Sequence, residues 1–134
     1  MNKLQVIIER AEDNYSAYIE GIDGVVATGE SIDEIKTNML EAIGIFVEEC
    51  RELGCEVPEA LQGEYEVNFK MDVSTLMAFY SGIFSKAGLE RLTGINQKQL
   101  WHYANGSSRP RPEQRQRIES ALHQLGHELI SVAL

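Results

Sequence analysis

The sequence predicts an α+β protein in which a small antiparallel sheet with one packed helix is followed by an all-α region and a short terminal strand. Three observations lead to this class. Apolar and polar residues alternate through most of the first 29 residues, which is the period of a strand with one buried face. A long apolar stripe at helical spacing follows, and from Asp72 onward the spacing is helical again. The last eight residues return to an alternating pattern.

Four strands are expected in the first 71 residues. Turn signals at residues 12–14 and 21–24 separate the first three, which form a predicted antiparallel meander. The fourth lies at residues 66–71, beyond a loop that contains Pro58, and we expect it to return to the sheet. The apolar positions of these strands are Leu4, Val6, Ile8, Tyr15, Ala17, Ile19, Val25, Val26, Val67, Phe69 and Met71.

One long helix is expected between the third and fourth strands. Ser31 is a good N-cap, Glu34 completes a capping box with it, and Gly54 ends the helix. The apolar positions recur every three or four residues and need an apolar partner, for which the sheet is the obvious candidate. These positions are Ile32, Ile35, Met39, Ile43, Phe46, Cys50 and Leu53. Residues 1–71 therefore form a predicted β-β-β-α-β domain.

The second predicted domain spans residues 72–134 and is mostly helical. Its helices begin at capping residues and end at glycines. The expected starts are Asp72 or Ser74, Ser85, Asn96 and Pro112, and the expected ends after the first helix are Gly94, Asn105-Gly106 and Gly126. The fourth helix is expected from Glu113 to Gln124. Residues 127–134 are expected to form a short strand, which must join the first sheet or pair with another subunit because an isolated strand is not stable.

The charge is distributed unevenly along the chain. The net charge is −9, from 12 Lys and Arg side chains and 21 Asp and Glu side chains. Residues 1–80 carry 5 basic and 17 acidic side chains, a net −12, whereas residues 81–134 carry 7 and 4, a net +3. Acidic surface keeps a small protein soluble, but solubility does not explain the change of sign. The asymmetry indicates two modules with different partners.

No membrane or targeting segment is expected. The sequence has no run of 18 or more apolar residues, and its first residues lack the apolar stretch of a signal peptide. The expected location is therefore the cytoplasm. Cys50 falls on the apolar helix face and Cys55 just past the helix end, which favours a buried thiol and a loop thiol over a zinc site or a disulfide.

A short helix, a glycine turn and a second capped helix describe a unit that reads DNA. The string from Leu89 to Gly106 resembles phage-repressor-type helix-turn-helix domains. The resemblance implies that Gly94 is the turn glycine and that residues 95, 100 and 103 are core positions. It also identifies one departure, because Glu90 stands where that family usually carries a small residue.

The exposed side chains of this unit have the chemistry of a DNA interface. Gln can pair with adenine in the major groove, and Lys can reach the acceptors of guanine. The turn after the third helix contains Arg and Ser without an acid, which suits contacts to phosphates. The predicted DNA-binding residues are Asn96, Gln97, Lys98, Gln99, His102, Ser107, Arg109 and Arg111. The alternative interpretation is a solvated polar face on a small helical bundle.

The first module has its own resemblance. The string from Tyr15 to Ile35, continued by Asn38 and by Glu41-Ala42-Ile43, resembles HicB-type antitoxins of toxin–antitoxin systems, although the proline that is usual in their turn is absent here. The resemblance implies a partial ribonuclease H-like sheet and helix that bind a small, basic, RNA-cleaving HicA-type toxin. It also implies that the DNA-binding end represses the protein's own operon. The net charge of −12 on residues 1–80 would independently attract a basic partner.

An enzyme is not expected. Glu9, Glu20 and Asp23 lie at strand ends and turns, and no motif links them into a two-metal site. No Ser-His-Asp arrangement, phosphate loop or metal-ligand spacing is present, so no catalytic residue, metal or cofactor is predicted.

A second functional interpretation remains open: a DNA-binding transcriptional regulator whose first module senses a small molecule. A neighbouring gene for a short basic protein would separate the antitoxin from the sensor. Repressor-like units usually bind two half-sites, so a homo-oligomer, a dimer or higher, is expected in either case.

Overall fold

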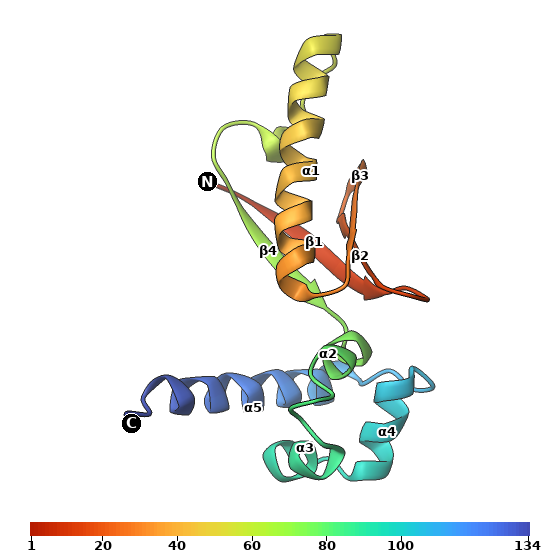
Figure 1. Ribbon diagram of the computed structural model, residues 1–134, viewed down its shortest axis with the longest axis vertical. Helices are drawn as coiled ribbons and strands as arrows, with labels where there is room; N and C mark the ends of the chain where they lie inside the picture. Colours follow the sequence, from red (N-terminus) through yellow and green to blue (C-terminus); the bar gives the residue numbers. More distant parts are fainter. The chain divides into compact units, whose positions relative to one another are not determined.

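The computed structural model describes residues 1–134 and divides them into two compact units, Met1–Thr75 and Leu76–Leu134 (Figure 1). From the sequence, the boundary between the two domains is predicted at residues 71/72. All strands lie in the first unit, whereas α3, α4 and α5 lie in the second, and α2 (Val73–Phe79) spans the division. None of the helices combines the length and hydropathy that a membrane-spanning segment needs.

The first unit is built on a four-stranded sheet in the order β3-β2-β1-β4. The strands are β1 (Asn2–Arg10), β2 (Tyr15–Ile19), β3 (Ile22–Gly29) and β4 (Tyr65–Met71). The β1–β2 and β2–β3 pairs are antiparallel, but β4 runs parallel to β1. The predicted antiparallel sheet is therefore wrong. The helix after β3 carries the chain back along the sheet, so that the next strand runs in the direction of β3 and β1.

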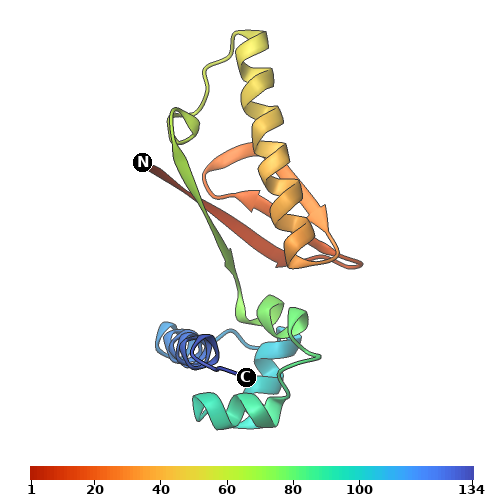
Figure 2. The same cartoon turned by 60° about the vertical axis from the view of Figure 1, so that its left-hand side comes forward.

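Helix α1 (Ile32–Leu53) lies across one face of the sheet (Figure 2). The Ser31 side chain accepts the Glu34 N–H at 3.1 Å, and Gly54 ends the helix with a φ of +71°, as the capping pattern predicts. The core consists of one face of each of the first three strands and one stripe of α1. Its buried residues are Leu4, Val6, Ile8, Ala17, Ile19, Val25, Ala27, Ile35, Met39 and Ile43.

Two contacts hold the start of α1 against β3. The Asn38 side chain donates a hydrogen bond to the Thr28 carbonyl at 2.8 Å. Gly29 allows a close approach, because a Cβ there would lie 2.8 Å from Ile35 Cγ1 and 3.1 Å from the Ile35 backbone nitrogen. The edge strand β4 is covered less completely, and Lys36 Nζ lies 5.3 Å from the centre of the Phe69 ring.

The second unit is helical. Its elements are α3 (Lys86–Thr93), α4 (Gln97–Asn105) and α5 (Pro112–Ile130), preceded by the end of α2. The Asp72 carboxylate accepts the Thr75 N–H at 2.8 Å, so Asp72 rather than Ser74 caps α2. Five apolar side chains from the three later helices and the α3–α4 turn form the buried core: Leu89, Ile95, Leu100, Tyr103 and Ile118.

The predicted terminal strand is also wrong, because α5 continues to Ile130 and only the last residues are irregular. Gly126 lies inside the helix, and its φ is not positive, so it does not end it. The apolar residues at 118, 121, 122, 125 and 129 keep helical spacing through the glycine. The strands thus all precede the second unit, and the chain ends in a helix rather than in the strand of the predicted fold class.

Candidate functional site

The turn between α3 and α4 is held by side-chain bonds as well as by its glycine. Gly94 has a φ of +75°, which favours glycine, and its N–H donates to the Glu90 carbonyl at 2.7 Å. The buried Thr93 hydroxyl donates to the Leu89 carbonyl at 2.7 Å, and it accepts the Ile95 N–H at 3.1 Å. Since Thr93 bonds to residues on both sides of the turn, local contacts hold the two helices in one arrangement.

Glu90 joins α3 to the first turn of α4. Its half-buried side chain accepts the Gln97 N–H at 2.7 Å through Oε2. The Asn96 side chain accepts the Gln99 N–H at 2.8 Å, so two amides that a helix start leaves free are satisfied. The negative charge of Glu90 also suits the positive end of the α4 dipole. A residue that departs from the helix-turn-helix pattern therefore serves as a second cap.

The exposed face of α4 carries Gln97, Lys98 and Trp101, which we call the α4 face. Their spacing places them on one side of the helix, whereas Leu100 and Tyr103 are buried. The Trp101 side chain is 52 % exposed. A large aromatic ring left in solvent between polar residues is an informative departure from the usual distribution, because such rings are enriched where a partner binds.

The structure separates Gln99 from the α4 face. Its side chain is half-buried, and Nε2 donates to the Ser108 hydroxyl at 3.4 Å, on a different side of the helix from Lys98. Asn96 is committed to capping. Of the predicted residues in the first turn of α4, only Gln97 and Lys98 therefore share the exposed face.

His102 is half-buried behind Trp101. Its Nδ1 lies 3.0 Å from the Ser107 hydroxyl oxygen. The imidazole ring of His102 and the indole ring of Trp101 meet edge-on, with their centres 5.0 Å apart. The Ser107 N–H donates in turn to the Asn105 side chain at 2.9 Å. His102 therefore contacts both the Trp101 ring and the turn after α4.

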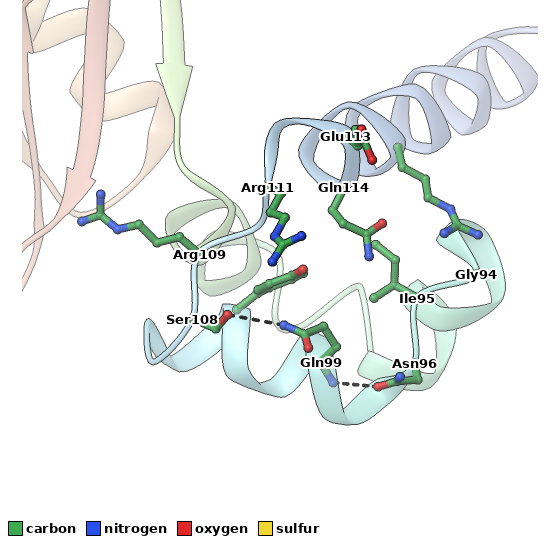
Figure 3. A pocket seen from close by; sticks show the side chains of 11 residues that line it. Gly94, Ile95, Asn96, Gln99, Ser108, Arg109, Arg111, Glu113 and Gln114 are labelled. Carbon is green, nitrogen blue, oxygen red and sulfur yellow. Dashed lines mark hydrogen bonds between the residues drawn. The ribbon is translucent and has the colours of Figure 1, made fainter.

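A polar cleft of about 710 Å³ separates the start of α4 from the start of α5 (Figure 3). Figure 3 shows Arg111 and Gln114 pointing into the cleft and Arg109 pointing away from it. Three arginines and one glutamate line it, which is a net formal charge of +2. The lining residues are Gly94, Ile95, Asn96, Gln99, Tyr103, Ser108, Arg109, Arg111, Glu113, Gln114 and Arg117.

Several residues of the α4 face and the cleft are missing from the predicted set, among them Trp101, Gln114 and Arg117. The sequence contains a signal for Trp101. This residue lies four positions after Gln97 and three after Lys98 on a predicted helix, a spacing that places all three on one face. Gln114 and Arg117 have no comparable signal. They reach the cleft because α5 packs against α3, which the local sequence pattern does not reveal.

The first unit presents acidic surface on α1. Glu41, Ile45, Glu48 and Glu52 are all exposed, and their spacing of four, three and four residues places them in one stripe along the helix. We call this set the α1 acidic stripe. The Ile45 side chain is 51 % exposed within it, so the stripe combines charge with an apolar contact point.

The sheet face away from α1 carries Tyr18, whose hydroxyl donates to Glu9 Oε1 at 3.2 Å. Partial burial, this hydrogen bond and the charges of Glu9 and Glu20 raise the pKa of Tyr18 above its ordinary value. The phenol therefore stays a neutral hydrogen-bond donor.

Metal-binding geometry is not found. No group of three or more His, Cys, Asp or Glu side chains could hold a metal ion. Cys50 is half-buried, Cys55 is exposed, and both are free thiols. Comparison with protein-family models, curated proteins and solved structures finds no match for this chain.

Glu90 provides a direct test of this local arrangement. Glu90→Ala removes the acceptor of the Gln97 N–H and should lower the free energy of unfolding by about 1 kcal/mol, the usual effect of losing a cap. Glu90→Gln keeps an acceptor oxygen and should cost less than half as much. Urea unfolding of the three proteins measures the difference. An alanine variant as stable as the parent, or more stable, would mean that this position needs space rather than a cap.

Proposed function

We propose that the protein is an antitoxin that binds a small, basic, RNA-cleaving toxin through its first unit and represses its own operon by binding operator DNA through its second. The observation that carries the proposal is the joint presence of the α4 face and the arginine-lined cleft on a unit of net charge +3, within a chain whose other unit carries −12. In this account the chain acts by binding and not by catalysis, in the cytoplasm.

The support for DNA binding is chemical and geometric. Gln97 and Lys98 are the first two residues of a capped helix, and both are exposed. Side chains at the start of a recognition helix are those that reach base edges in the major groove. The glutamine amide suits adenine, the lysine ammonium suits guanine, and the Trp101 ring offers an apolar contact for a thymine methyl group.

Self-association would let two copies of this unit bind the two half-sites of an operator. The C-terminal half of α5 extends beyond α3 and α4 (Figure 1), and its Leu129 and Ile130 side chains are 61 % and 83 % exposed. Exposed apolar side chains next to each other favour a protein contact over free solvent. We propose that two copies associate through this segment, because repressors of this kind read two half-sites.

The support for a basic partner is the charge of the first unit. The α1 acidic stripe has three carboxylates on one exposed helix face, around Ile45. Opposite charge steers a basic protein toward such a face, and a central apolar side chain supplies the contact that charge alone does not. We propose the stripe as the surface that meets the toxin.

Replacing Gln97 and Lys98 with alanine should abolish selective DNA binding. Two base contacts at about 1–3 kcal/mol each correspond to a loss of roughly 30-fold or more in affinity for the operator. We expect the parent to bind the DNA upstream of its own gene with two chains per duplex. Fluorescence anisotropy with that duplex and with an unrelated one of equal length measures both affinities. Asn68→Ala/Lys70→Ala, an exposed amide and lysine pair on β4 of the first unit, is the matched control. Unchanged selectivity in the double variant of α4 would contradict the assignment of these side chains.

Reversing the α1 acidic stripe should weaken toxin binding. We expect the full chain to co-purify with the short basic protein encoded beside it. Glu41→Lys/Glu48→Lys should lower that affinity at least tenfold. Glu12→Lys/Asp13→Lys changes the net charge equally, in the exposed turn after β1, and should have a smaller effect. Titration calorimetry at two salt concentrations measures both. Failure of the parent chain to retain such a protein would remove the antitoxin half of the proposal, and equal losses in the two variants would exclude the stripe as the contact surface.

A further inference from the structure

The cleft beside α4 has the features of an anion-binding site, and the α4 face does not share these features. Arg111 and Gln114 point into it from the start of α5 (Figure 3). No hydrogen bond or ion pair within the protein engages the guanidinium of Arg111 or Arg117. Guanidinium groups on the wall of a polar cleft, without a carboxylate bonded to them, are arranged to bind an anion from outside the chain.

The turn glycine makes room for one of these arginines. A Cβ on Gly94 would lie only 2.6 Å from Arg117 Nη2, so the guanidinium rests directly against the turn between α3 and α4. Gly94 is thus needed both for its positive φ and for the space that it leaves. The arginine is consequently held beside the helix that carries the α4 face, although α5 contributes it.

The start of α4 itself does not supply the anion-binding groups. The Gln97 N–H donates to Glu90, and the Gln99 N–H donates to Asn96. Since these two amides are already satisfied, they are not available to an anion in the cleft. The lining includes one carboxylate, Glu113, and Arg109 points away, so Arg111, Arg117 and Glu113 leave a net formal charge of +1 at the cleft.

We propose that this cleft binds a single phosphate group through Arg111, Gln114 and Arg117, and that the phosphate belongs to the DNA backbone beside the bases that α4 reads. The inference rests on the proposed function for its source of phosphate. Guanidinium groups fit the oxygens of a phosphodiester, and the Gln114 amide adds a neutral donor. Phosphate binding here would set the depth and register of α4 in the groove without selecting a sequence.

The test is the salt dependence of DNA binding. Arg111→Gln/Arg117→Gln should lower affinity for the operator and for an unrelated duplex by the same factor, roughly eightfold at 0.1 M salt, and should reduce the slope of log K against log salt by about 0.9, the value for one phosphate contact. Arg51→Gln/Arg91→Gln removes the same charge from exposed arginines outside the cleft and outside residues 96–117, and should leave the slope nearly unchanged. Thermal unfolding checks that both variants are folded.

Three results would overturn the inference, and each is distinguishable from the expected one. Equal slope changes in the two variants would mean that the cleft arginines contribute only through the net charge of the protein. If the parent chain binds DNA and the cleft variant has an unchanged slope, the cleft does not bind a DNA phosphate, and the proposed function is unaffected. Saturable binding of inorganic phosphate below about 1 mM that is lost in the cleft variant, together with an unchanged salt slope of DNA binding, would assign the site to a free phosphate and not to DNA. A parent chain that binds neither duplex would contradict the proposed function itself.

Discussion

The contact between α3 and α4 is the constraint on which the rest of the second unit depends. Gly94 turns the chain, Thr93 bonds to both sides of the turn, and the Glu90 carboxylate accepts the first amide of α4. Together these bonds determine which side chains of α4 are buried and which are exposed. The same turn accommodates Arg117, so the arrangement of the polar cleft follows from it as well.

The two units differ in charge and in the kind of surface that they expose. The first carries −12 and presents carboxylates along α1, whereas the second carries +3 and presents arginines around a cleft. A polyanion and a basic protein would therefore each meet a different unit. This separation is the physical basis of the proposed function, because one chain can then bind DNA and a basic partner without competition for one surface.

Features with local causes are predicted well from the sequence. Ser31, Gly54, Ser85, Gly94 and Asn96 each act as the predicted cap or stop, because capping depends on residues within one turn. The direction of β4 and the end of α5 are predicted wrongly, since both depend on where distant segments lie. Eight residues that alternate can pair as a strand or continue a helix, and Ile118, Leu122 and Leu125 extend the helical pattern through Gly126. The same limit applies to the site. Gln99 falls outside the exposed face because the phase of α4 is set by packing, and Arg117 reaches the cleft from another helix.

We propose that α4 and the start of α5 form the DNA-binding surface of the chain. An amide NMR titration of the full chain with duplex DNA from upstream of its gene is the most direct test of this assignment. We expect chemical-shift changes concentrated in residues 96–117, with the sheet and α1 unaffected. Changes centred on the first unit, or no changes in residues 96–117 when DNA is bound, would contradict it.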